Sequence, residues 1–184
     1  MTLDPTLGYL VVAGCALLFA GAGAHKVRSF AHFAEVFAAY QVLPQALARS
    51  VAWLVPCAEL AIAAALLWTP GRRAGVAAAI GVLLAYALAI AVNLRRGRLN
   101  LDCGCGPMRD RRPIAWWMVG RNLLLALGLA VAALPWTARA LGATDALTIA
   151  GGLAAATALY LALDQLFGEV APRARAMRGG GRLT

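Results

Sequence analysis

Long hydrophobic runs separated by short polar connections dominate the pattern of this chain. Five of the runs approach the ~20 residues that a helix needs to cross the hydrocarbon of a bilayer. They cover residues 7–24, 46–68, 74–94, 114–134 and 146–167. Alanine and glycine are frequent in them, as in "CALLFAGAGA" and "TIAGGLAAATA", and small residues let helices pack closely. The pattern predicts an all-α fold, a polytopic membrane helix bundle with five transmembrane helices.

A further helical pattern lies between the first two runs, in "SFAHFAEVFAAY". Its aromatic residues recur at helical spacing, at Phe30, Phe33, Phe37 and Tyr40. Such a segment is typical of a short helix in the membrane interface, and a packed turn between two transmembrane helices is the alternative. From Gly168 the apolar periodicity ends, so we expect a transmembrane domain of residues 1–167 and a basic, disordered tail of residues 168–184.

The composition favours a membrane protein over a soluble helical core. Only 14% of the residues are charged, against about a quarter in a soluble domain, and 62% are hydrophobic. The start of the chain, "MTLDPTLGYL", lacks the basic residues of a secretion signal, so we expect the first run to be retained as a helix. The net charge of +9 does not indicate a nucleic-acid partner, because the arginines gather at the ends of the apolar runs.

The basic residues are distributed unequally between the two faces that five crossings define. Thirteen fall on one face and three on the other. The larger group is Lys26, Arg28, Arg49, Arg95, Arg96, Arg98, Arg109, Arg111, Arg112 and the arginines at 173, 175, 178 and 182, and the smaller is Arg72, Arg73 and Arg139. Loops rich in Lys and Arg stay in the cytoplasm. We therefore expect a multi-pass protein of the inner cell membrane, with its N-terminus outside and its C-terminus and the loop at 99–113 in the cytoplasm.

That loop, "LNLDCGCGPMRDRRP", carries Cys103 and Cys105, separated by one glycine. A disulfide between them closes a very small ring, which a glycine backbone permits. A strained, exposed disulfide is easily reduced, and neighbouring arginines favour the reactive thiolate. The pattern predicts a catalytic, redox-active dithiol.

Two other interpretations of the loop stay open. Cys103 and Cys105 could form a metal site with a histidine, since the predicted topology puts His25 and His32 on the same face and these ligand types suit zinc or copper, although no second closely spaced ligand pair is present. Alternatively, the two cysteines are inert thiols in a structural turn.

The remaining cysteines, Cys15 and Cys57, lie within the first and second runs. Counting ~1.5 Å per residue places them at similar depths in neighbouring antiparallel helices. If their sulfurs meet, they form a second dithiol at mid-membrane and an electron relay becomes conceivable. Otherwise they are two small apolar core residues.

Ionisable side chains also fall inside the runs. Glu59 lies near the middle of the second run, and Arg121, beside Asn122, lies about two turns into the fourth. Because ionisable groups are costly in lipid, we predict a Glu59–Arg121 ion pair with hydrogen bonds from Asn122. Asp164 is expected to reach the interface or a tail arginine. His25 is expected to assist proton transfer at the thiols or to extend to the interface.

Three segments of the chain together resemble the MauE family of methylamine utilisation membrane proteins, which is related to DoxX. They are "GAGAHKVRSFAHFAEVFAAYQVLP", "PCAELAIAAALL", and "LDCGCGP" followed by "IAWWMVGRNLLLAL". The similarity covers about residues 7–134. Its most specific part is Cys-Gly-Cys followed by a tryptophan-rich helix with Arg-Asn. Cys103 and Cys105 match the first motif, and Arg121 and Asn122 match the second.

The resemblance implies a role in maturing the disulfide-rich small subunit of methylamine dehydrogenase, or another exported protein, beside a thioredoxin-like partner. The implied chemistry is thiol–disulfide exchange, with a quinone cofactor left open. In this scheme Cys105 attacks, since it lies nearer the N-terminus of the fourth helix, and Cys103 resolves the mixed disulfide. A metal-handling membrane protein and a non-catalytic scaffold are the alternative functions.

Overall fold

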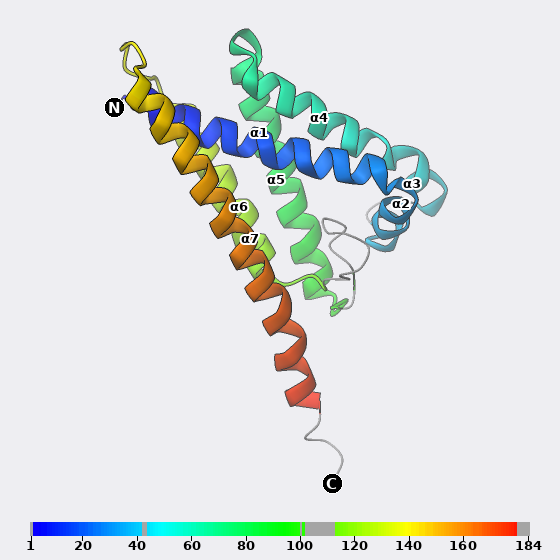
Figure 1. The fold of residues 1–184 in the computed structure, drawn as a ribbon. Helices are drawn as coiled ribbons and strands as arrows, with labels where there is room; N and C mark the ends of the chain where they lie inside the picture. Colours follow the sequence, from blue (N-terminus) through cyan, green and yellow to red (C-terminus); the bar gives the residue numbers. More distant parts are fainter. Residues whose placement is uncertain (1, 42–43, 100, 102–112, 180–184) are drawn as a thin grey trace.

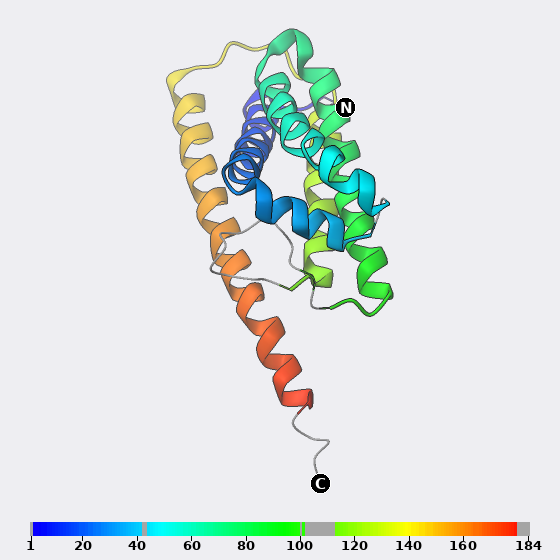
Figure 2. The same ribbon diagram turned by 90° about the vertical axis from the view of Figure 1, so that its right-hand side faces the viewer.

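The computed structural model describes residues 2–41, 44–99, 101 and 113–179, without the side chains of residues 45–46 and 167–179. The described chain is almost entirely helical, and Figures 1 and 2 show how the helices are arranged. In chain order the elements are α1 (Pro5–Arg28), α2 (Phe30–Ala39), α3 (Gln45–Ala52), α4 (Leu54–Leu67), the 3-10 helix η1 (Thr69–Gly71), α5 (Arg72–Arg95), α6 (Trp116–Ala132) and α7 (Ala143–Gly179).

The predicted all-α polytopic membrane fold is confirmed. Within the described ranges, four helical stretches are long and apolar enough to span a bilayer, namely Pro5–Arg28, Leu47–Leu67, Thr69–Arg95 and Ala143–Leu166. The predicted fourth crossing corresponds to α6, whose 17 residues fall short of the ~20 of a usual span. The aromatic segment after α1 forms α2 as predicted, whereas the second predicted run is divided at Trp53 into α3 and α4.

The helix α1 lies inside the bundle and packs against α4, α6 and α7, while α5 packs against α4 and α6. The contact between α1 and α4 is close because Gly23 has no side chain. A Cβ atom at Gly23 would lie 2.9 Å from the Cγ atom of Leu60 and 3.2 Å from the carbonyl oxygen of Pro56. The main apolar core surrounds this contact and includes Val12, Phe19, Ile62, Leu66, Leu83 and Leu129.

The last helix, α7, lies on the outside of the bundle. None of the side chains of Ala143–Leu166 is buried, and in Figure 1 the end of α7 extends beyond the other helices. Its backbone is helical to Gly179, whereas the loss of apolar periodicity predicted a disordered tail from Gly168. Alanine and arginine are frequent in this stretch and favour helix without any periodicity.

The N-terminus, the α4–α5 turn and the α6–α7 connection lie toward one end of the bundle, which we call the N-terminal end. At the opposite end, polar contacts join α2 to the end of α5. The Nδ2 atom of Asn93 donates to the carbonyl oxygen of Tyr40 at 3.3 Å. Arg98 donates to Oε1 of Gln41. The start of α6 lies at this end too, so the end of α5, α2 and the start of α6 form one surface.

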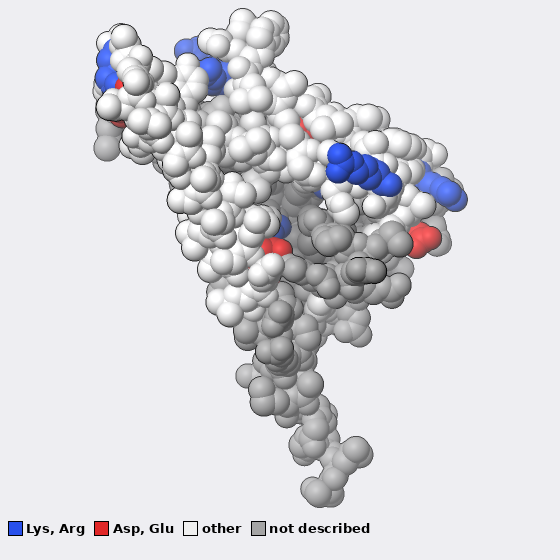
Figure 3. Space-filling view, in the orientation of Figure 1, with Lys and Arg blue, Asp and Glu red and all other residues white. Residues whose placement is uncertain are grey.

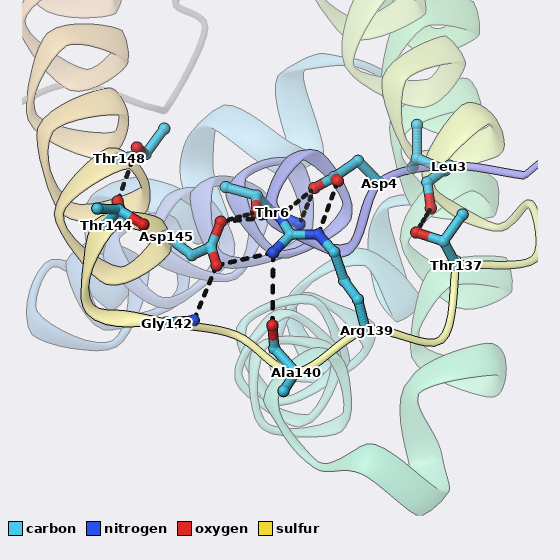
Figure 4. A network of polar contacts seen from close by, with 10 residues as sticks. All are labelled: Leu3, Asp4, Thr6, Thr137, Arg139, Ala140, Gly142, Thr144, Asp145 and Thr148. Carbon is cyan, nitrogen blue, oxygen red and sulfur yellow. Dashed lines mark hydrogen bonds and ion pairs between the residues drawn. The ribbon is translucent and has the colours of Figure 1, made fainter.

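Charged side chains at the N-terminal end tie the start of the chain to the start of α7 (Figure 4). Arg139 donates to Asp4 at 3.0 Å, to Asp145 at 2.8 Å and to Thr6 Oγ1 at 2.7 Å. The Gly142 N–H donates to Asp145 at 2.8 Å. The bond from Arg139, with that from the Thr6 backbone N–H, lowers the pKa of Asp4 to about 2. The bonds to Asp145 and Asp4 raise the pKa of Arg139.

We expect this Arg139 network to make stability depend on acid pH. Because the folded-state pKa of Asp4 lies below its ordinary value of 3.8, its contribution is complete above about pH 4 and is lost as the pH falls through about 2. The melting temperature of the detergent-solubilised protein should fall across that window, and Arg139→Gln should show a smaller fall. The control, Arg73→Gln at an exposed position, should keep the wild-type profile. Identical profiles for the protein and Arg139→Gln would contradict the prediction.

Candidate functional site

A lysine and a glutamate meet inside the bundle. The Nζ atom of Lys26, near the end of α1, lies 2.5 Å from Oε1 of Glu59 in α4, and their side chains are 3% and 1% exposed. The hydroxyl of Tyr86 in α5 donates to the same oxygen at 2.7 Å. Lys26 Nζ also lies 5.5 Å from the ring centroids of Phe33 and Tyr86. A buried charge of each sign is thereby paired, as low-dielectric surroundings require.

Helix packing explains why these two residues meet. Gly23 and Lys26 are three residues apart in α1, and Pro56 and Glu59 are three apart in α4, so each pair shares one face of its helix. Because Gly23 lies against Pro56 and Leu60, the two helices are close enough there for the long side chain of Lys26, one turn further along α1, to reach Glu59. The close approach at glycine therefore positions the ion pair.

The predicted Glu59–Arg121 ion pair is wrong. Glu59 pairs with Lys26 instead, because α1 remains helical to Arg28 and keeps Lys26 inside the bundle rather than at its edge. Arg121 Nη1 donates to the Tyr160 hydroxyl at 2.8 Å and lies 3.4 Å from Oδ1 of Asp164, both in α7. Asp164 thus reaches an arginine of α6.

A buried amide lines the same cavities as Lys26 and Arg121. The side chain of Asn122 is 4% exposed, and it makes no hydrogen bond within the described part of the chain, so the predicted support of a Glu59–Arg121 pair is absent there. Asn122 lines two cavities that share Lys26, Tyr86 and Arg121. Their volumes are about 420 and 260 Å³. The second carboxylate oxygen of Glu59, which lines the smaller cavity, is buried and likewise without a partner among the described residues.

Cys15 and Cys57 are both free thiols, so no disulfide joins them. Cys15 is 4% exposed and lines the smaller cavity, whereas Cys57 is exposed on α4. Their predicted depths in the membrane coincide, but the side chains take different environments. Cys15 therefore behaves as the small core residue that the sequence allows.

Cys103 and Cys105, the predicted catalytic pair, lie outside the described residues. His25 is half-buried in the last turn of α1, one residue before the buried Lys26. Among the described residues no group of three or more His, Cys, Asp or Glu side chains is arranged to hold a metal ion.

Four residues of this polar centre were not selected from the sequence as site residues: Lys26, Tyr86, Tyr160 and Asp164. Tyr86 and Tyr160 are tyrosines within the apolar runs "LLAYALA" and "ATALYLALD". A hydroxyl in lipid requires a partner, so each was a detectable signal. Lys26 directly follows the first predicted run, where a residue extended to the interface is the usual expectation.

Apolar helices that enclose paired charges and two cavities define a polytopic helical membrane protein with a polar centre. Comparison with known proteins gives the family. The family described as "Methylamine utilisation protein MauE" matches residues 4–137, and the chain belongs to it. The resemblance found in the sequence motifs is confirmed.

Relatives of similar length carry the same description. The methylamine utilization protein MauE of Paracoccus denitrificans is 39% identical over 81% of this chain and 80% of its own length. The MauE proteins of Methylophilus methylotrophus and Methylorubrum extorquens are 35% and 34% identical, over 91% and 83% of this chain and 90% and 81% of their own lengths. No solved structure matches the chain.

A mutant cycle tests whether Lys26 and Glu59 act as a pair. Lys26→Met leaves the Glu59 carboxylate buried alone and should lower the free energy of unfolding by about 3–5 kcal/mol. Glu59→Leu should have a similar effect. Since the double variant leaves no unpaired charge, it should recover most of the loss, as measured by chemical unfolding in detergent. Additive losses in the double variant would show that the two side chains act independently.

Proposed function

We propose that this chain is a membrane thiol–disulfide exchange protein of methylamine utilisation, in which Cys103 and Cys105 form the reactive pair. The related MauE proteins are named for methylamine utilisation, which supports the physiological setting. The substrate class is a disulfide-rich exported protein such as the small subunit of methylamine dehydrogenase. A thioredoxin-like protein is the exchange partner.

The observation that carries the proposal is Cys-Gly-Cys in a connection whose two ends are joined. The N–H of Ile114 donates to the carbonyl oxygen of Leu101 at 3.0 Å. Ile114 is completely buried, and both residues pack with Leu94 and Met118 at the ends of α5 and α6. The segment that carries the thiols therefore starts and ends at one anchored point, beside the end of α5 and the start of α6.

The chemistry proceeds in two exchange steps. The Cys105 thiolate attacks a disulfide sulfur of the partner, one partner thiolate leaves, and a mixed disulfide forms. Cys103 then attacks the Cys105 sulfur, which releases the second partner thiolate and leaves a Cys103–Cys105 disulfide. The reverse sequence oxidises a partner dithiol. The glycine between the cysteines permits the small ring, and the arginines of this loop favour thiolate over thiol.

Single substitutions should separate the two roles. Cys103→Ala removes the resolving thiol, so a mixed disulfide with the thioredoxin-like partner should accumulate on non-reducing gels. Cys105→Ala removes the attacking thiol and should give no adduct. The control is Cys57→Ser, an exposed cysteine on α4, which should behave like the unmodified protein. Equal adducts in all three variants, or none in any, would contradict the exchange mechanism.

We also propose that the Cys-Gly-Cys loop and the C-terminus face the cytoplasm and the N-terminus faces outward, on the strength of the basic-residue distribution. In a Cys15→Ser, Cys57→Ser background, a membrane-impermeant maleimide should label Cys103 and Cys105 only after the cells are permeabilised. Labelling of intact cells would reverse the topology and bring the thiols directly to an exported substrate.

A further inference from the structure

The larger cavity lies among α2, α4, α5 and α6, at the end of the bundle from which the Cys-Gly-Cys connection leaves. At about 420 Å³ it falls within the range of ~300–1,000 Å³ typical of sites for small organic ligands. Its walls are mainly aliphatic and aromatic, with Phe33 and Phe37 from α2. Leu54, which also lines it, is 65% exposed, so the cavity adjoins the outer surface of the bundle, where lipid lies in a membrane.

The polar end of this cavity has an unmet hydrogen-bonding requirement. The Asn122 amide is buried, lines the cavity and has no partner within the described residues. An unpaired buried amide is costly, so it points to a ligand that completes its hydrogen bonds. The amide offers a donor NH₂ group and an acceptor oxygen. It therefore matches a ligand whose head group carries a carbonyl oxygen in its oxidised form and a hydroxyl group in its reduced form.

The charges beside Asn122 select the kind of head group. Within the described residues, Lys26 is paired with Glu59 and Arg121 with Asp164, so each of these two cations already has an acidic partner. An anionic lipid head group would meet cations that are already neutralised. A neutral ring with oxygen substituents instead gains hydrogen bonds without disturbing either pair.

We propose that the larger cavity binds the ring of a lipid-soluble quinone, with Asn122 bonded to a ring oxygen. The proposal rests on the proposed function, because it supplies the oxidant that regenerates the reactive disulfide. When the two thiols of Cys103 and Cys105 are oxidised, two S–H bonds break and one S–S bond forms, with loss of two electrons and two protons. The quinone takes up both and becomes a hydroquinone with two new O–H bonds. Exchange with a partner dithiol then reduces the Cys103–Cys105 disulfide again.

Binding is measured first without the thiols. In a Cys103→Ala, Cys105→Ala background, the detergent-purified protein is titrated with ubiquinone-1, and quenching of tryptophan fluorescence is followed. We expect saturable quenching. Asn122→Leu should raise the Kd about tenfold, the loss expected for one hydrogen bond to a buried group. Ala89→Phe, which fills the cavity, should raise it at least as much.

The matched control is Ala78→Phe, which adds the same side chain at an exposed position of α5 outside the cavity and should leave the Kd unchanged. Absence of saturable quenching, or equal Kd values in Ala78→Phe and Ala89→Phe, would overturn the quinone site. Displacement of ubiquinone-1 by phospholipid, with no effect of Asn122→Leu, would identify an acyl-chain pocket and overturn it too.

A second measurement separates this site from the proposed function. In the protein with all four cysteines, ubiquinone-1 should oxidise the Cys103–Cys105 dithiol and should fail to do so in Ala89→Phe. If ubiquinone-1 binds to the protein with all four cysteines but does not oxidise the dithiol, the quinone is not the oxidant. Trapping of a mixed disulfide would then still support the exchange function. Failure of trapping with intact ubiquinone-1 binding would refute the exchange function and leave the site.

Discussion

The need to pair every charge inside a low-dielectric bundle organises this protein. Lys26 of α1 meets Glu59 of α4 beneath the Tyr86 hydroxyl of α5, and Arg121 of α6 meets Tyr160 and Asp164 of α7. Each helix longer than ten residues therefore contributes a polar group to one centre. An unpaired charge here would cost far more than an apolar contact gains, so the two pairs restrict how the helices rotate against each other.

The outer position of α7 shows the same constraint at work. Its residues Ala143–Leu166 bury no side chain, so apolar packing on α1 is a small part of its attachment. Polar contacts act at two levels instead: Asp145 with Arg139 at the N-terminal end, and Tyr160 and Asp164 with Arg121 near the middle of the bundle (Figures 2 and 4). In a bilayer the lipid competes equally well for apolar surface, which makes such polar contacts decisive for helix association.

Hydrophobic run lengths predict the membrane fold and place α1, α5 and α6 within a few residues, because burial in lipid depends on composition over a whole segment. They also identify Glu59 and Arg121 as interior residues. They do not predict the partners, since depth along a helix says nothing about the direction in which a side chain points. Cys15 and Cys57 illustrate this, because similar depths lead to one buried and one exposed thiol. A lysine at the end of an apolar run is usually expected at the membrane interface. Lys26 is buried instead, because α1 continues past it to Arg28.

The paired charges also explain why a cavity persists beside them. Aromatic and aliphatic side chains from α2, α4 and α5 form most of its walls. Lys26 and Arg121 also line it, and each is held by an acidic partner, which fixes where its side chain lies. Around the two cavities, the polar atoms that lack a hydrogen-bond partner within the described residues include the Asn122 amide and one oxygen of Glu59. Figure 3 shows basic and acidic atoms meeting beside α7 at the surface of the bundle. A neutral, oxygen-bearing ring satisfies such a site, whereas a charged ligand would have to break an ion pair to bind.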